Sequence, residues 1–171
     1  MAKKWYLLFV IIIFLTLLSA CSANIEEEQK KAVEAAHSSF LEKKTAPNKE
    51  LDAISLYLPF RMDIDDTNPY NLLLTKGNQS YILFINPNEE ENSQVVYETT
   101  IQGADQIRIN ETFQEDDKFG FIIIQDIGDE LYSLTVGRGG IKMTTETDAG
   151  AIAREAGTMM KIVSSVQFNK N

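Results

Sequence analysis

A short acidic segment is the part of the sequence that most resembles a ligand site. Five of six consecutive side chains there carry oxygen: Asp63, Asp65, Asp66, Thr67 and Asn68. Calcium takes about six to eight oxygen ligands, and an Asp-x-Asp start is typical of a calcium loop. Asn68 stands where an EF-hand loop has glycine, and Leu74 stands where it has a bidentate glutamate. Asp63, Asp65 and Asp66 are therefore weak ligand candidates, and a turn before Pro69 explains them equally well.

Two further acidic runs, 89–91 and 115–117, fall where hairpin loops are expected, so we predict solvated loop tips. The glycine-rich segment 137–140 lacks the Gly-Lys-Ser/Thr ending of a phosphate-binding loop. We predict a hairpin turn there, with Arg138 as a surface arginine at its tip.

Groups for nucleophilic or zinc chemistry are scarce in this chain. His37 is its one histidine and Cys21 its one cysteine, so neither a multi-histidine nor a multi-cysteine zinc site can form within it. Ser38 and Ser39 follow His37, but no Gly-x-Ser-x-Gly elbow and no second histidine accompany them. The sequence therefore predicts no catalytic constellation, no enzyme activity, no cofactor and no metal.

The N-terminal 20 residues have the parts of a secretory signal. Lys3 and Lys4 precede an apolar run of about 14 residues, shorter than the roughly 20 needed to span a bilayer. The segment Leu18-Ser19-Ala20-Cys21 then resembles the bacterial lipobox. The resemblance implies cleavage before Cys21 and two acyl chains at that residue, which together anchor a protein stably. We therefore expect a signal peptide at 1–20 and one lipid-anchored domain at 21–171 on the extracytoplasmic face of the cell membrane.

The composition supports a small acidic domain. The chain has 171 residues, is 44% hydrophobic and carries a net charge of −9. Outside the signal segment, 14 of its 16 basic residues stand against all 25 acidic ones. This balance argues against nucleic-acid binding and against docking on anionic headgroups through protein charge.

The elements that must position these residues are predicted from hydrophobic periodicity. Apolar residues at helical spacing predict a helix over 25–44 and another after a cap at Asp148. Segment 50–58 is compatible with either a short helix or an extended conformation. Strands are predicted at 70–75, 79–85, 95–101, 107–113, 119–124, 132–136 and 141–143, with 119–124 as the central strand. The predicted fold is α+β: an antiparallel sheet of about six to eight strands, with an N-terminal and a C-terminal helix packed on one face.

Three functions follow as hypotheses. The first is a non-enzymatic, lipid-anchored binding or assembly module of the cell envelope, with an envelope protein as partner. The second is a lipoprotein that binds a small ligand or a divalent ion through the region of Asp63, Asp65 and Asp66. The third is an envelope hydrolase that acts through paired carboxylates. Two converging carboxylates in an apolar pocket would favour the hydrolase, and a flat apolar patch would favour the binding module.

Overall fold

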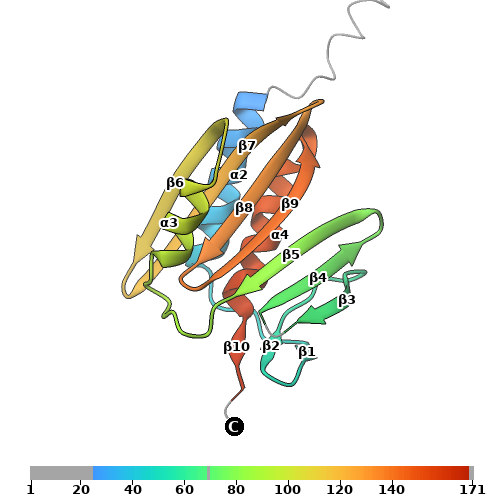
Figure 1. The fold of residues 1–171 in the computed structure, drawn as a ribbon, viewed down its shortest axis with the longest axis vertical. Coiled ribbons are helices and arrows are strands. Elements are labelled where there is room, and N and C mark those ends of the chain that lie inside the picture. Colours follow the sequence, from blue (N-terminus) through green and yellow to red (C-terminus); the bar gives the residue numbers. More distant parts are fainter. Residues whose placement is uncertain (1–24, 69, 170–171) are drawn as a thin grey trace, which may run out of the picture.

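The computed structural model describes residues 25–68 and 70–169, and its main element is a seven-stranded sheet (Figure 1). The strand order is β3-β4-β5-β9-β8-β7-β6, and every neighbouring pair is antiparallel. The strands are β3 (Asp63–Asn68), β4 (Asn71–Lys76), β5 (Gln79–Ile85), β6 (Ile107–Glu115), β7 (Lys118–Gly128), β8 (Leu131–Arg138) and β9 (Ile141–Asp148). The predicted α+β fold with one antiparallel sheet is confirmed.

A three-stranded sheet in the order β1-β2-β10 lies at one end of the molecule (Figure 1). Its strands are β1 (Lys49–Glu50), β2 (Ile54–Leu56) and β10 (Gln167–Phe168). Segment 50–58 is thus largely extended. The Asn169 side-chain amide donates to the Leu51 carbonyl oxygen at 2.7 Å. The segment between α2 and β3 is therefore joined to the C-terminal end of the described chain in this sheet.

Helices α2 (Ile25–Leu41) and α4 (Ile152–Ser165) pack side by side on one face of the large sheet (Figure 1). Ala36 and Phe40 of α2 and Ile152 and Met159 of α4 are fully buried in the core between the helices and the sheet. Helix α2 ends at Leu41 rather than at the predicted residue 44. None of the described helices has the length and hydropathy of a membrane span.

The start of α4 is fixed by the predicted cap. A carboxylate oxygen of Asp148 accepts the Ala151 backbone N–H at 3.0 Å. This bond closes η2 (Ala149–Ala151), a single turn of 3₁₀ helix that continues directly into α4. The cap satisfies one of the donors that a helix N-terminus leaves unpaired.

Helix α3 (Val95–Gln102) corrects the prediction of a strand over 95–101. The segment is rich in β-branched residues, which favour strands in isolation. It lies on the opposite face of the sheet from α2 and α4, where Val96 packs with Phe119, Phe121 and Ile123 of β7. Burial of this aromatic and aliphatic surface overrides the local strand preference.

Strand β7 is second from the edge of the sheet, so the prediction that 119–124 forms the central strand is wrong. The apolar run has a different cause. Ile122 and Ile124 face α2 and α4, whereas Phe121 and Ile123 face α3. A strand covered on both faces reads as a continuous apolar run wherever it lies in the sheet.

Candidate functional site

The face of the sheet that carries α3 is only partly covered. Among the described elements, α3 covers β7 and its neighbours and reaches Phe84 and Lys142, while the rest of the same face of β4, β5 and β9 has no helix over it (Figure 1). We call this uncovered part the bare face. The residues that define it are Leu73, Ile82, Ser133, Thr144 and Glu146, and its border with α3 is formed by Phe84 and Lys142.

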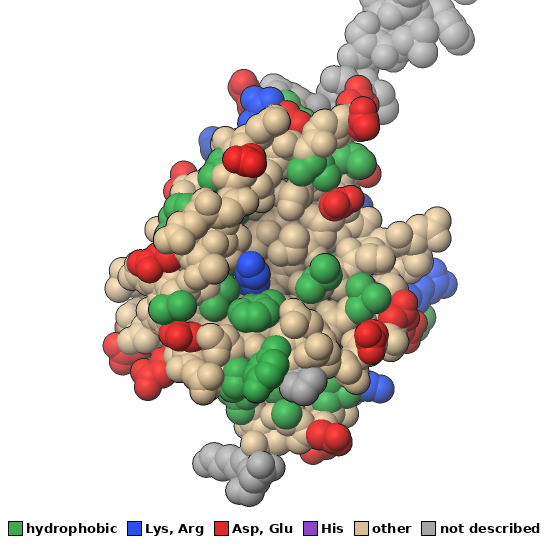
Figure 2. All heavy atoms as spheres, viewed as in Figure 1, with side chains coloured by type: hydrophobic (Ala, Val, Ile, Leu, Met, Phe, Trp, Pro, Cys, Tyr) green, Lys and Arg blue, Asp and Glu red, His purple; other side chains and the backbone are tan. Residues whose placement is uncertain are grey.

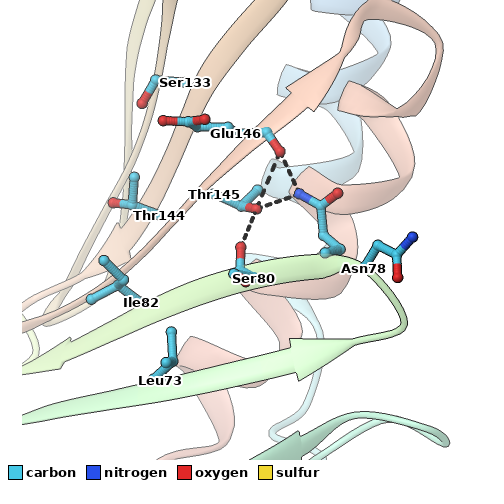
Figure 3. A pocket seen from close by; sticks show the side chains of 9 residues that line it. Leu73, Asn78, Ser80, Ile82, Ser133, Thr144, Thr145 and Glu146 are labelled. Carbon is cyan, nitrogen blue, oxygen red and sulfur yellow. Dashed lines mark hydrogen bonds between the residues drawn. The ribbon is translucent and has the colours of Figure 1, made fainter. Parts of the chain in front are cut away.

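Rows of paired residues run across the bare face. Leu73 of β4 pairs with Ile82 of β5, and Ile82 pairs with Thr144 of β9 (Figure 3). The side chain of Leu73 is 38% exposed and that of Ile82 is 54% exposed. Both lie in the predicted strands 70–75 and 79–85, whose continuous apolar runs predict burial of every side chain, so their exposure is a correction. Two adjacent exposed aliphatic side chains on a sheet form an apolar patch that water does not favour.

A groove of about 390 Å³ lies over this patch. Leu73, Ser80, Ile82, Ser133, Thr144 and Glu146 are among its lining residues, and their side chains point into the same region (Figure 3). At one end, the Gln79 amide donates to the Thr145 hydroxyl at 2.5 Å and to the Glu146 carbonyl oxygen. The floor is therefore apolar in the middle and polar at its end.

Lys142 borders the groove in the next row of residue pairs, where it faces Phe84 of β5. Its Nζ donates to the Thr100 hydroxyl of α3 at 2.9 Å and lies 5.8 Å from the centre of the Phe84 ring. Figure 2 shows basic side-chain atoms in the middle of this side of the molecule, with hydrophobic side chains beside them. Burial lowers the pKa of the Lys142 ammonium below its ordinary value of 10.5.

The lining of this groove suits binding better than acid–base catalysis. Glu146 is the one ionisable side chain among its lining residues. Hydrolysis through paired carboxylates needs a second acid or base within reach of the same substrate. An apolar floor with a few hydroxyl groups, one carboxylate in its lining and the Lys142 ammonium in the next row of residue pairs can orient a ligand instead.

The glycine-rich segment 137–140 forms the predicted turn between β8 and β9, but Arg138 does not lie at its tip. Arg138 is only 5% exposed, its guanidinium donates to the Glu91 carboxylate at 2.5 Å, and it lies over the Phe40 ring. Lys44 pairs with the other oxygen of Glu91. The prediction of a surface arginine is therefore wrong, and Glu91 is not simply a solvated loop residue.

The glycines of this segment are required by close packing. A Cβ on Gly137 would lie 2.2 Å from the Phe121 ring, and one on Gly139 would lie 2.3 Å from the Glu90 carbonyl oxygen. Gly139 also has a φ of +52°. The loop before α3 thus packs directly on the turn between β8 and β9, and Arg138 joins them. A second groove, of about 410 Å³, lies beside this contact.

The three candidate aspartates lie in β3, an edge strand, so the prediction of a turn is wrong for them. Pro69 lies outside the described residues. Asp65 accepts a hydrogen bond from the Thr75 hydroxyl at 3.2 Å, and the sheet register shifts between Ile64 and Asp66. Within 25–68 and 70–169, no three His, Cys, Asp or Glu side chains are grouped so that they could hold a metal ion.

His37 is exposed on α2, and its ring stacks on Phe113 of β6 with 4.9 Å between the ring centres. The contact between these two rings fixes α2 against the sheet.

A buried polar pair was not predicted from the sequence: the Tyr81 hydroxyl donates to Glu155 at 2.8 Å. Burial, followed by this hydrogen bond, raises the pKa of Tyr81 above its ordinary value of 10.0. In the sequence, this pair is indicated by Glu155, an acidic residue within the apolar stripe of α4.

Cys21 lies outside the described residues, so the structure carries no information about the lipobox. Comparison of the chain with known protein-family models and with curated proteins gives no match.

Proposed function

We propose that the protein is a non-enzymatic binding module of the cell envelope, held on the outside of the cell membrane by lipid on Cys21. Its binding surface in this proposal is the bare face. The observation that carries the proposal is the paired exposure of Leu73 and Ile82 beside a groove and a half-buried lysine.

Leu73 and Ile82 could be polar without harm to the fold, because the opposite face of the sheet supplies the main core. Exposed apolar residues that adjoin one another in a hollow are typical of ligand or partner sites. The groove supports a small ligand more strongly than a large protein partner. Its volume of about 390 Å³ lies within the range of roughly 300–1,000 Å³ found for small-molecule sites.

The anchor in this proposal rests on the lipobox Leu18-Ser19-Ala20-Cys21. Helix α2 begins at Ile25, four positions after Cys21. Two acyl chains on Cys21 would hold the domain stably. The short connection would keep the bare face close to the membrane surface and within reach of molecules that are concentrated there.

The proposal can be tested without knowledge of the ligand. Ile82 is replaced by the photoreactive residue p-benzoylphenylalanine, and the full-length protein is irradiated in the cells that make it. The expected result is an added mass on the purified protein. The same residue placed at Phe60, 85% exposed, or at Ile127, 44% exposed, serves as a control that should gain none. Absence of an adduct at position 82, or equal adducts at all three positions, would overturn the proposal.

A further inference from the structure

Lys142 is a half-buried basic side chain that donates to a hydroxyl group rather than to a carboxylate. Arg108, Arg138, Arg154, Lys31 and Lys44 each form an ion pair with a carboxylate. Lys142 forms none within the described residues, although it is half-buried. An ammonium group has three N–H donors, and the structure provides an acceptor for one of them, the Thr100 hydroxyl.

The surroundings of Lys142 disfavour its charge. Thr100 lies in the last turn of α3, where the helix dipole attracts a cation, and the Phe84 ring adds a weak attraction. Burial lowers the pKa of the Lys142 ammonium, because the charged form loses water. A half-buried cation without an anionic partner is less stable than one that is paired. An anion bound at this point would restore the missing interaction.

The apolar patch begins one row of residue pairs away from Lys142. Two residues along a strand span roughly 7 Å and two strand spacings roughly 10 Å, so Leu73 lies about 12 Å from Lys142 across the sheet. Ile82 lies between them. A molecule with its anionic group at Lys142 would therefore place its body on Ile82 and Leu73. Glu146, farther along β9, would repel the anionic group and thus fix the direction of binding.

From this arrangement we infer that the bare face binds a free monocarboxylate with an apolar chain, the carboxylate at Lys142 and the chain over Ile82 and Leu73. This inference rests on the proposed function and specifies its ligand. A bilayer lipid is a poorer occupant. The patch lies in a hollow rather than on a protruding surface, and a chain with net charge −9 is repelled by anionic headgroups.

The test uses the full-length lipidated protein in phosphatidylcholine nanodiscs, with empty nanodiscs as the blank. Isothermal titration measures the binding of octanoate, of octanol, which lacks the charge, and of acetate, which lacks the chain. Octanoate is expected to bind at least tenfold more tightly than either of the others. Thermal melting of each variant establishes that it is folded before its affinity is compared.

Variants separate the charge from the apolar contact. K142Q is expected to weaken octanoate binding at least tenfold and to leave octanol binding unchanged, while K142R retains most of the octanoate affinity. K161Q is the matched control, because the Lys161 ammonium also lies over an aromatic ring, that of Tyr57. It should have no effect. The double variant L73S/I82S should lose both octanoate and octanol.

Other outcomes overturn the inference in distinguishable ways. In one such outcome, octanoate and octanol bind equally, K142Q has no effect on either, and L73S/I82S loses both. This result would show that Lys142 has no role in binding, while the bare face would still be a binding surface. Failure of octanoate to bind the folded parent protein would exclude this class of ligand. The cross-linking result at position 82 would then decide separately whether the bare face is occupied by something else.

Discussion

The guanidinium of Arg138 lies 2.5 Å from the Glu91 carboxylate, and this ion pair joins the end of β8 to the loop that precedes α3. Glu91 also accepts from Lys44, just beyond the end of α2. Three segments that are distant in sequence therefore meet at one carboxylate. The position of α3, which borders the bare face, depends on this contact.

We predict that E91Q destabilises the fold. Arg138 is almost fully buried and would lose its anionic partner, but Glu91 itself is about half exposed, so solvent would screen part of the loss. The expected decrease in the free energy of unfolding is about 1–2 kcal/mol. Urea unfolding measures it. E90Q, at an exposed neighbour, is the control, and equal stability of the two variants would contradict the role assigned to Glu91.

The same carboxylate predicts a dependence on pH. Burial raises the pKa of Glu91, but the hydrogen bonds from Lys44 and Arg138 outweigh it, so the net pKa lies below the ordinary value of 4.5. A carboxyl with a lowered folded-state pKa stabilises the fold above its unfolded-state pKa, and that stability is lost as the pH falls through the folded-state pKa. The parent protein should therefore lose more stability than E91Q when the pH falls below about 4.5. Parallel loss in both proteins would argue against this linkage.

A pair of glycine substitutions tests the packing of the turn between β8 and β9. Gly77 and Gly139 both have positive φ, but a Cβ at Gly77 meets open space whereas one at Gly139 meets the Glu90 carbonyl oxygen. G77A should cost about 1 kcal/mol for the backbone conformation alone. G139A should cost about 3 kcal/mol, because overpacking adds to the backbone term. Similar melting temperatures for the two variants would show that the loop before α3 accommodates the added methyl group at little cost in stability.

The sequence was sufficient for the general architecture because periodicity reports burial directly. The apolar stripe of α4, the cap at Asp148 and the adjoining strands β4 and β5 all correspond to predicted features. Helix α3 could not be predicted in this way. Its residues 95–101 favour a strand locally, and only the aromatic surface of β7, more than 15 positions away, makes the helix stable.

The candidate site could not be predicted from the sequence, for a related reason. Leu73 and Ile82 lie within continuous apolar runs, which are the same whether the second face of a strand is covered or bare. Lys142 and Arg138 are ordinary basic residues in the sequence. Their different environments, one without an acid and one paired and buried, arise from which side of the sheet each faces.

The lipid anchor leads to a prediction for Cys21. C21S removes the sulfur to which the lipid is attached, so the protein should lose its fatty acid label and either leave the membrane or accumulate with its signal peptide uncleaved. Growth with labelled palmitate followed by gel electrophoresis and fractionation measures both effects. C21S that is labelled and membrane-bound to the same extent as the parent would disprove the lipobox assignment.

Side-chain oxidation in intact cells gives the most direct test that the bare face is a binding surface. Hydroxyl radicals modify exposed side chains, and mass spectrometry compares each site in cells with the same site in the purified, folded protein. We expect protection of Leu73 and Ile82 in cells, and equal oxidation of the exposed Phe60 and Ile127 in both samples. Oxidation of Leu73 and Ile82 that is as extensive in cells as in the purified protein would contradict it.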